Sequence, residues 1–177
     1  YLLIEIEKEA VDEEENSFIN VYGELKFVLS AIDAATSIEA AAGMVAKELK
    51  RISGFDKVMV YQFDEGWNGT VIAEEAERGM DAYLGLKFPA SDIPKGARDM
   101  YQKTPYRLIP NADYVPVRLY PVINPATHAF TDLSPTNLRS VAAVHIEYLH
   151  NMNVTASMST RILKGDRLWG LISCHHR

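Results

Sequence analysis

The C-terminal part of the chain predicts a β-hairpin. Two strand-like segments, 154–163 and 167–176, flank a short Lys164-Gly165-Asp166 turn. Strands joined by so short a turn pair antiparallel, because a parallel pair needs a crossover of a dozen or more residues. The fold must therefore contain an antiparallel sheet.

A second strand pair is predicted nearer the N-terminus. Side chains alternate over residues 58–63 as they do in a strand, and the Glu65-Gly66-Trp67-Asn68-Gly69 turn leads into a second strand over 70–77. A proline-rich loop over 108–135 follows later in the chain, with a strand fragment expected near 115–120. Loops of this length within a domain are usually functional.

Helices are predicted around these strands. Apolar residues recur at helical spacing over 18–32, and Thr36 with Glu39 forms a capping-box pattern before the next helix. Gly54 is a typical residue for the end of that helix. The predicted helices are 18–32, 37–51, 92–103 and 138–152.

The order of these elements predicts an α+β fold, with helices on the faces of a central antiparallel sheet. A chain of 177 residues usually forms one main domain. Residues 1–7 alternate apolar and acidic side chains like a strand that closes a preceding domain, and 9–15 is an acidic linker. We therefore expect a boundary between segments 1–15 and 16–177.

Composition excludes several classes of function. The net charge of −6 argues against nucleic-acid binding, which needs a basic face. No apolar run reaches the roughly 18–20 residues of a membrane span, and a cytoplasmic protein is the default expectation. Cys174 is the single cysteine, so the chain holds no internal disulfide and no cysteine-based zinc site.

The segment Pro89-Ala90-Ser91-Asp92-Ile93-Pro94 is the clearest candidate for a binding element. It places one carboxylate and neighbouring backbone carbonyls in a turn bounded by prolines. Asp92 could instead be the N-cap of the helix predicted over 92–103, since aspartate is common at that position. The two interpretations are compatible.

Two arginines are candidates for binding carboxylates. A guanidinium group presents a planar fork of donors that matches a carboxylate. Arg139 lies at the start of the predicted helix 138–152, whereas Arg107 precedes the proline-rich loop. The alternative is that both are ordinary surface arginines.

The histidines do not form a metal-binding pattern. His145 and His150 are five residues apart on a predicted helix, and His175 and His176 are adjacent on a strand and point to opposite sides. His145 could equally be a core histidine. Cys174 lies in an apolar strand and no phosphate-binding glycine loop is present, so the sequence indicates no enzyme.

An ordered set of motifs carries a specific resemblance. The motifs are Tyr61-Gln62-Phe63-Asp64, Trp67-Asn68-Gly69, Tyr83-Leu84-Gly85-Leu86, the segment around Asp92, Leu138-Arg139-Ser140-Val141, His145-Ile146-Glu147-Tyr148-Leu149, and Leu168-Trp169-Gly170-Leu171-Ile172 ending in Cys174-His175-His176. With them, the chain resembles the chromophore-binding GAF domain of bacterial phytochromes. These photoreceptors sense red and far-red light with a linear tetrapyrrole.

The resemblance implies the GAF fold, with a central antiparallel sheet of five or six strands flanked by helices. It also implies a bilin pocket, in which the backbone carbonyl of Asp92 and the ring of His145 hydrogen-bond the pyrrole network. Arg107 and Arg139 would pair with the propionates. His175 would bind the carbonyl of the outer D ring.

Further pocket residues follow from the same resemblance. Tyr101, Ser157 and Ser159 would join the arginines at the propionates, and a mainly apolar group would surround the D ring. The expected cofactor-binding residues are Asp92, Ile93, Pro94, Arg107, Arg139, His145, Tyr148, Ser157, Ser159, His175, Met59, Tyr61, Val71, Phe88 and Tyr101.

The chain departs from the family at the attachment site of the bilin. Val144 stands where plant and cyanobacterial members carry the attaching cysteine. In bacterial members that cysteine lies ahead of the preceding PAS domain. We therefore expect this chain to bind biliverdin, or a related linear tetrapyrrole, without a covalent bond. Ala142-Ala143 also replaces the usual Ser-Pro pair.

The resemblance implies a sensory domain of a histidine kinase in a two-component system, with PAS and PHY-type neighbours. Residues 1–15 would end the PAS-like domain, and a long helix would follow residue 177. The apolar stripe over 18–32 is compatible with a homodimer. The alternative is a pigment-free GAF module for dimerisation or signal relay. A cyclic-nucleotide-binding GAF domain fits the motifs less well.

Overall fold

A computed structural model describes residues 3–6 and 18–177 of the chain. Its sheet has six antiparallel strands in the order β3-β2-β1-β6-β5-β4. The strands are β1 Lys57–Phe63, β2 Gly69–Ala76, β3 Lys87–Phe88, β4 Tyr106–Ile109, β5 Ala156–Lys164 and β6 Arg167–His176. The helices are α1 Phe18–Asp33, α2 Ile38–Ser53, α3 Lys95–Lys103 and α4 Ala143–Asn151. The predicted α+β architecture, with helices around a central antiparallel sheet, is confirmed.

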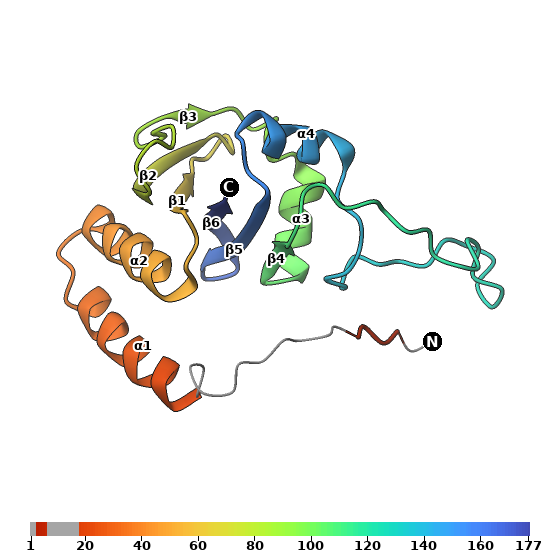
Figure 1. Ribbon diagram of the computed structural model, residues 1–177, viewed down its shortest axis with the longest axis horizontal. Helices are drawn as coiled ribbons and strands as arrows, with labels where there is room; N and C mark the ends of the chain where they lie inside the picture. Colours follow the sequence, from red (N-terminus) through yellow and green to blue (C-terminus); the bar gives the residue numbers. More distant parts are fainter. Residues whose placement is uncertain (1–2, 7–17) are drawn as a thin grey trace.

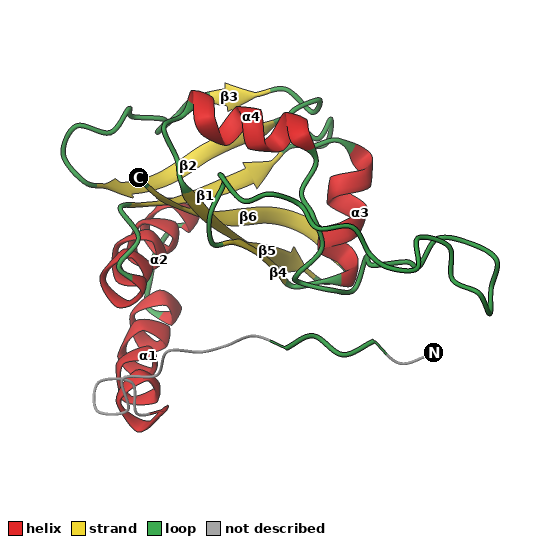
Figure 2. Cartoon of the chain, turned by 45° about the vertical axis from the view of Figure 1, so that its right-hand side comes forward, coloured by secondary structure: helices red, strands yellow, loops and turns green. Residues whose placement is uncertain are grey.

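Helices cover both faces of this sheet (Figures 1 and 2). α2 packs against β1 and β2 on one face, and α1 packs against α2. α3 and α4 lie on the other side, where α3 contacts β5 and β6. The long loop between β4 and α4 extends away from the sheet. The two faces of the sheet therefore have different environments.

Strand β1 lies inside the sheet and is buried on both faces. Val58 and Val60 pack with Ala42 and Ala46 of α2, in one apolar cluster. Met59, Tyr61 and Phe63, the alternate residues, belong to a second cluster on the opposite face. The two-residue period of a strand thus separates the core into two halves.

A β-bulge changes the alternation of the neighbouring strand β2. Val60 pairs with Ala73, but Tyr61 pairs with Val71, so Ile72 is an extra residue. Without the bulge Val71 and Ala73 would point to the same face. Instead Ala73 packs on the α2 side and Val71 packs with Tyr61 on the other side.

The ends of α2 are capped as the local sequence requires. The Ser37 side chain accepts a hydrogen bond of 3.1 Å from the backbone N–H of Ala40. Gly54 ends the helix in the left-handed region, with φ of 70°, and its N–H donates to the carbonyl of Lys50. The end at Gly54 is confirmed, whereas the predicted cap at Thr36 is wrong by one residue.

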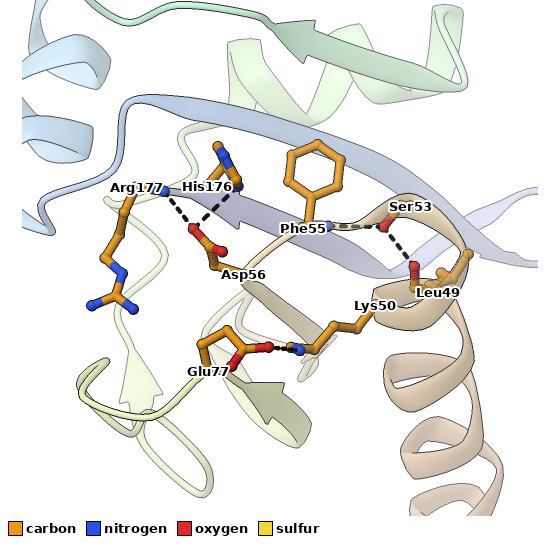
Figure 3. A network of polar contacts seen from close by, with 8 residues as sticks. All are labelled: Leu49, Lys50, Ser53, Phe55, Asp56, Glu77, His176 and Arg177. Atoms are coloured by element: carbon orange, nitrogen blue, oxygen red, sulfur yellow. Dashed lines mark hydrogen bonds and ion pairs between the residues drawn. The ribbon is translucent and has the colours of Figure 1, made fainter. Parts of the chain in front are cut away.

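A polar network fastens the start of β1 to the end of β6 (Figure 3). The Asp56 carboxylate accepts a 2.8 Å hydrogen bond from the backbone N–H of Arg177 and lies 3.1 Å from Nδ1 of His176. Nearby, Lys50 of α2 forms an ion pair with Glu77, which follows β2. These contacts hold α2, β1, β2 and β6 together at one end of the sheet.

Two predicted helices are shorter than expected. The helix predicted over 92–103 begins at Lys95, because Pro94 occupies the N-cap position with an extended ψ of 162°. The N-cap interpretation of Asp92 is therefore wrong. The helix predicted over 138–152 is α4, which begins at Ala143, so Arg139 lies in the preceding loop rather than at the helix start.

The strands of the structure differ from the predicted strands in three places. The fragment expected near 115–120 is wrong, since this segment forms no strand in the structure and its Val115 and Val117 side chains are exposed. Strands β3 and β4 were not predicted. β3 has only two residues, too few for a pattern, and β4 is defined by its pairing with β5.

The N-terminal expectations are met in part. α1 confirms the helix predicted over 18–32. Residues 3–6 have no regular structure, so they do not form the expected strand. The linker 9–15 and the boundary after it lie outside the described residues. No helix of the described part is long and apolar enough to cross a bilayer.

We predict that Gly170→Ala strongly destabilises the fold. A Cβ atom at this position would lie 2.3 Å from the backbone oxygen of Tyr61 on the paired strand. Such overpacking between two backbones lowers the free energy of unfolding by about 3 kcal/mol. Urea denaturation measures this change. Gly43→Ala is the matched control, because its Cβ meets no atom within 4 Å and a helix gains stability from alanine. Equal stability of both variants would refute the prediction.

Candidate functional site

A cavity lies on the face of the sheet opposite α2. It encloses about 920 Å³ of empty space, including its open mouth. Twelve of the fifteen expected cofactor-binding residues line it: Met59, Tyr61, Val71, Phe88, Asp92, Ile93, Tyr101, His145, Tyr148, Ser157, Ser159 and His175. Pro94, Arg107 and Arg139 do not. The remaining lining residues are Tyr83, Ala97, Leu149, Met152, Leu171 and Ser173.

Alternate side chains of neighbouring strands form the floor of the cavity. Met59 of β1 is paired with Ser173 of β6, which is paired in turn with Ser159 of β5. His175 and Ser157 form the next pair along the same face. Residues from three strands therefore meet because the antiparallel register places them side by side.

The ring of Tyr61 is positioned by a glycine on the adjacent strand. A Cβ atom at Gly69 would lie 1.6 Å from Cζ of Tyr61, so only glycine leaves room for the ring. The ring packs edge-on against Phe63, with 5.3 Å between centroids, and lies 6.1 Å from Phe88. Burial, and then the charge of Asp92, raises the pKa of Tyr61 to about 12. The phenol is neutral at physiological pH.

α4 contributes two stacked rings. The imidazole of His145 and the phenol of Tyr148 lie nearly parallel, with centroids 6.5 Å apart. Burial, followed by the charge of Arg107, lowers the pKa of His145. The imidazole is therefore neutral at physiological pH and has one ring nitrogen that donates and one that accepts.

His175 is the most deeply buried polar group of the cavity. Only 5% of the residue is exposed. Its Nε2 atom lies 3.1 Å from Oγ of Ser173, and its Nδ1 atom has no hydrogen-bond partner among the described residues. Burial, followed by the charges of Lys57 and His145, lowers its pKa to about 4. His175 is thus a neutral group with an unused hydrogen-bonding atom.

The turn around Asp92 lies at the edge of the cavity. The backbone N–H of Asp92 donates to the carbonyl of Pro89 at 3.0 Å, and the hydroxyl of Ser91 lies 3.3 Å from Oδ1 of Asp92. Asp92 and Ile93 line the cavity, whereas Pro94 is the N-cap of α3. After burial, the charge of Asp92 raises the pKa of Tyr61 and of Tyr148, so its carboxylate lies near both rings.

Arg107 and Arg139 lie beside the cavity and bind backbone carbonyls. Arg107 donates to the carbonyls of Asn137 and Arg139, and Arg139 donates to that of Thr136 at 2.7 Å. Neither has an ion pair with a carboxylate of the described residues. Burial lowers the pKa of both, and the charge of Arg139 lowers that of Arg107 further. Tyr101 and Ser159, whose hydroxyls are 2.5 Å apart, link this region to the floor.

A buried ion pair supports one wall of the cavity and was missed at the sequence level. Nζ of Lys57 lies 2.8 Å from Oε1 of Glu74, and their side chains are only 1% and 7% exposed. Lys57 also lies 3.8 Å from the ring centroid of Tyr83, whose backbone N–H donates to Glu74. The sequence feature that could have revealed it is Lys57 itself, which lies two and four residues before Met59 and Tyr61 and so shares their otherwise apolar face of β1.

Hydrogen bonds lower the pKa of Glu74 despite its burial. Burial alone would raise the pKa of Glu74, but hydrogen bonds from Lys57 and from the N–H groups of Tyr83 and Leu84 lower it below its usual value. The Glu74 carboxylate is therefore charged, and it holds the segment that carries Tyr83 against the sheet.

The side chains that line the cavity suit the binding of a ligand. The walls are mainly apolar and aromatic, with neutral histidines, hydroxyls and one carboxylate at defined places. In residues 3–6 and 18–177, no group of three or more His, Cys, Asp or Glu side chains could hold a metal ion. Such a pocket suits a large conjugated ligand with a few polar atoms.

Comparison with known proteins relates the chain to one family. The GAF domain model matches residues 37–177. The chain is 46% identical, over 99% of its length, to cyanobacterial phytochrome B of Nostoc sp., and 48% identical, over 84%, to a bacteriophytochrome of Xanthomonas campestris pv. campestris. It covers 23% and 24% of these two proteins, so it spans about a quarter of the length of the curated relatives.

Solved structures agree with the sequence matches. A bacteriophytochrome from R. palustris matches with a TM-score of 0.88 and 39% identity, over 93% of this chain and 33% of that one. The chromophore-binding domain of Stigmatella aurantiaca phytochrome P1 matches with a TM-score of 0.86 and 43% identity, over 94% and 54% of the two chains.

We predict that His175 makes the fold less stable in acid. Its pKa lies near 4 in the folded chain against an ordinary 6.5, so the unfolded chain binds more protons between these values. Stability therefore falls as the pH drops from 6.5 towards 4. Between pH 7 and pH 5 the contribution is about 2 kcal/mol. His175→Gln should lose about this much less than the parent chain, as measured by urea denaturation at both pH values. Parallel losses would refute the prediction.

Proposed function

Since the chain belongs to the GAF domain family, we propose that it is the photosensory domain of a phytochrome-type sensor and binds a linear tetrapyrrole. The cavity beneath α4 would be the binding site, and biliverdin is the tetrapyrrole that we propose. The names of the matched proteins support this, since they include phytochromes and a chromophore-binding domain.

The cavity itself carries the proposal. Its walls are mainly apolar and aromatic with a few polar groups at defined places, which is the composition of pockets that hold cofactors. Biliverdin has apolar faces, pyrrole nitrogens along its centre and two propionates. The site offers aromatic walls, polar groups at Asp92 and His145, and the cations Arg107 and Arg139 beside it. The unpartnered Nδ1 of buried His175 also needs a ligand atom or water, because an unpaired buried polar group is costly.

Each polar group of the site has a role in this proposal. The carbonyl of Asp92 accepts from the pyrrole N–H groups, and neutral His145 supplies an accepting nitrogen to the same network. His175 donates to the carbonyl of the outer ring. Arg107 and Arg139 release backbone carbonyls and bind the propionates, a stronger interaction because both partners are charged. Ser157, Ser159 and Tyr101 add hydroxyls at the propionate side.

The apolar residues hold the outer ring of the ligand. Met59, Tyr61, Val71, Phe88 and Tyr148 line the cavity from β1, β2, β3 and α4. When bound, the tetrapyrrole supplies the absorption of red light. The protein residues confine its shape, exclude water and stabilise its protonated pyrroles.

The binding would be non-covalent in this chain. Position 144 carries valine, and Cys174 packs with the α2-side cluster, on the face of the sheet away from the cavity. Burial raises the pKa of Cys174 to about 11, so its thiol is protonated as well as inaccessible. Cys174 therefore cannot attach a ligand in the cavity.

The proposal for the whole protein is a cytoplasmic sensor histidine kinase. PAS-like and PHY-type domains would flank this domain, which is sensory rather than enzymatic. The exposed Tyr22 and Leu29 of α1 favour contact with a second copy or another helix. The same exposed apolar residues support the alternative, a pigment-free GAF module that dimerises or relays signals.

Mixing the chain with biliverdin tests the proposal. We predict a sharp red absorption band that changes after red illumination, because the cavity holds the pigment in one conformation. The pigment should separate from the chain in acid urea, since no thioether forms. Asp92→Ala or His145→Ala should keep some pigment and impair the light-induced change. A spectrum equal to that of free biliverdin would favour the pigment-free alternative.

Arg139→Ala tests the propionate contact. We predict that it weakens biliverdin binding by about 1.5–3 kcal/mol, because a charged hydrogen bond is lost. Arg118→Ala, which removes the same charge from the exposed loop, should bind normally. Titration with biliverdin dimethyl ester distinguishes the causes: without propionate charges, the parent and Arg139→Ala should bind alike. A loss that persists with the ester would show a structural effect instead.

A further inference from the structure

Arg98 binds the turn that carries Asp92. The Nη1 atom of this α3 residue donates to the carbonyl of Ile93 at 2.6 Å and to that of Ala90 at 3.3 Å. Arg98 does not line the cavity. It therefore contacts the turn without lining the proposed ligand site.

Trp67 holds the guanidinium of Arg98 in place. Cζ of Arg98 lies 4.7 Å from the centroid of the indole ring, and Cζ of Arg167 lies 5.5 Å from it. Trp67 has a φ of 65°, a left-handed conformation that is strained for a bulky residue. The surrounding contacts maintain this conformation, since the N–H of Trp67 donates to the carbonyl of Asp64 at 3.2 Å.

Asn68 fixes the same turn from a second direction. Its Nδ2 donates to Oδ2 of Asp64 at 3.0 Å, so the amide group is oriented. Its Oδ1 then accepts from the backbone N–H of Ala90 at 3.3 Å. Ala90 is thus bound at its N–H by Asn68 and at its carbonyl by Arg98.

These contacts decide which carbonyls of the turn are available. Pro89 accepts from the N–H of Asp92, and Ala90 and Ile93 accept from Arg98. In the described part of the chain, the carbonyls of Ser91 and Asp92 accept no hydrogen bond. The carbonyl assigned to the pyrroles in the proposed function is therefore free, whereas the carbonyls of Pro89, Ala90 and Ile93 are hydrogen-bonded.

We propose that Arg98, stacked on Trp67, is a positioning residue that sets the pyrrole-binding carbonyl of Asp92. The inference rests on the proposed function, because it concerns how the same ligand is held. A guanidinium stacks on an indole with its face and donates hydrogen bonds from its edge at the same time. A lysine ammonium cannot do both in one position, so Arg98→Lys keeps the charge and loses the positioning.

The test compares Arg98→Lys and Arg98→Met with Lys95→Met. Lys95→Met is the matched control, because it removes a cation from the same helix, the Lys95 side chain is 81% exposed, and among the described residues its ion pair is with Asp99. In the pigment-free chain, carbon-13 carbonyl resonances of Ala90 and Ile93 should move in both Arg98 variants and not in the control. This readout depends on the turn and not on any pigment.

The second measurement is a pH titration of the red band with biliverdin bound. A hydrogen bond to the protonated pyrroles raises their pKa, so a displaced Asp92 carbonyl should lower it by about one unit. Affinity should fall about tenfold in both Arg98 variants, while the control titrates like the parent chain. The titratable groups lining the cavity are the same in every variant, so their effects cancel: Tyr61, Tyr83, Asp92, Tyr101, His145, Tyr148 and His175.

The outcomes separate the inference from the function on which it rests. If the parent chain binds biliverdin and both Arg98 variants titrate like the control, Arg98 does not position the carbonyl and the inference is wrong. If the parent binds no biliverdin, the proposed function fails, and the inference fails with it. Should Arg98→Met not fold, the charge-retaining Arg98→Lys decides between these results.

Discussion

The burial of strand β1 on both of its faces is the constraint on which the rest of the structure depends. One row of its side chains meets α2, and the other forms the floor of the cavity. Two glycines permit this arrangement, since Gly170 lets β6 approach the backbone of Tyr61 and Gly69 leaves space for its ring. The close fit of the sheet and the shape of the cavity therefore have the same origin.

Few charged groups lie around the cavity, and the two most deeply buried ones, Lys57 and Glu74, form an ion pair. The Lys57–Glu74 pair is buried, yet it gains hydrogen bonds from the segment of Tyr83 and a contact with the ring of that residue. A buried pair of this kind adds little net stability, but leaving one charge unpaired is costly. Burial, and then the charge of Lys57, disfavours protonation of neighbouring His175. The cavity consequently presents neutral imidazoles to a ligand.

At the periphery of the site, arginine side chains hold backbone carbonyls. Arg98 binds carbonyls of the Asp92 turn, and Arg107 binds those of Asn137 and Arg139. The two arginines differ in their other neighbours. Arg98 is stacked on Trp67, which suits a fixed role, whereas Arg107 repels nearby Arg139, which suits exchange of its partners for anionic groups.

The sequence by itself determined the elements that depend on local pattern. These are the two hairpins, α1, the end of α2 at Gly54, and the motifs that relate the chain to the GAF family and identify most of the cavity residues. Tertiary structure alone decided the bulge at Ile72, strands β3 and β4, the late starts of α3 and α4, and the partners of Lys57 and Arg98. The physical reason is the sequence distance over which each effect acts. Periodicity and helix capping depend on residues close together in the sequence. Strand register, the burial of a charge and the stacking of side chains depend on segments that meet only in the folded chain.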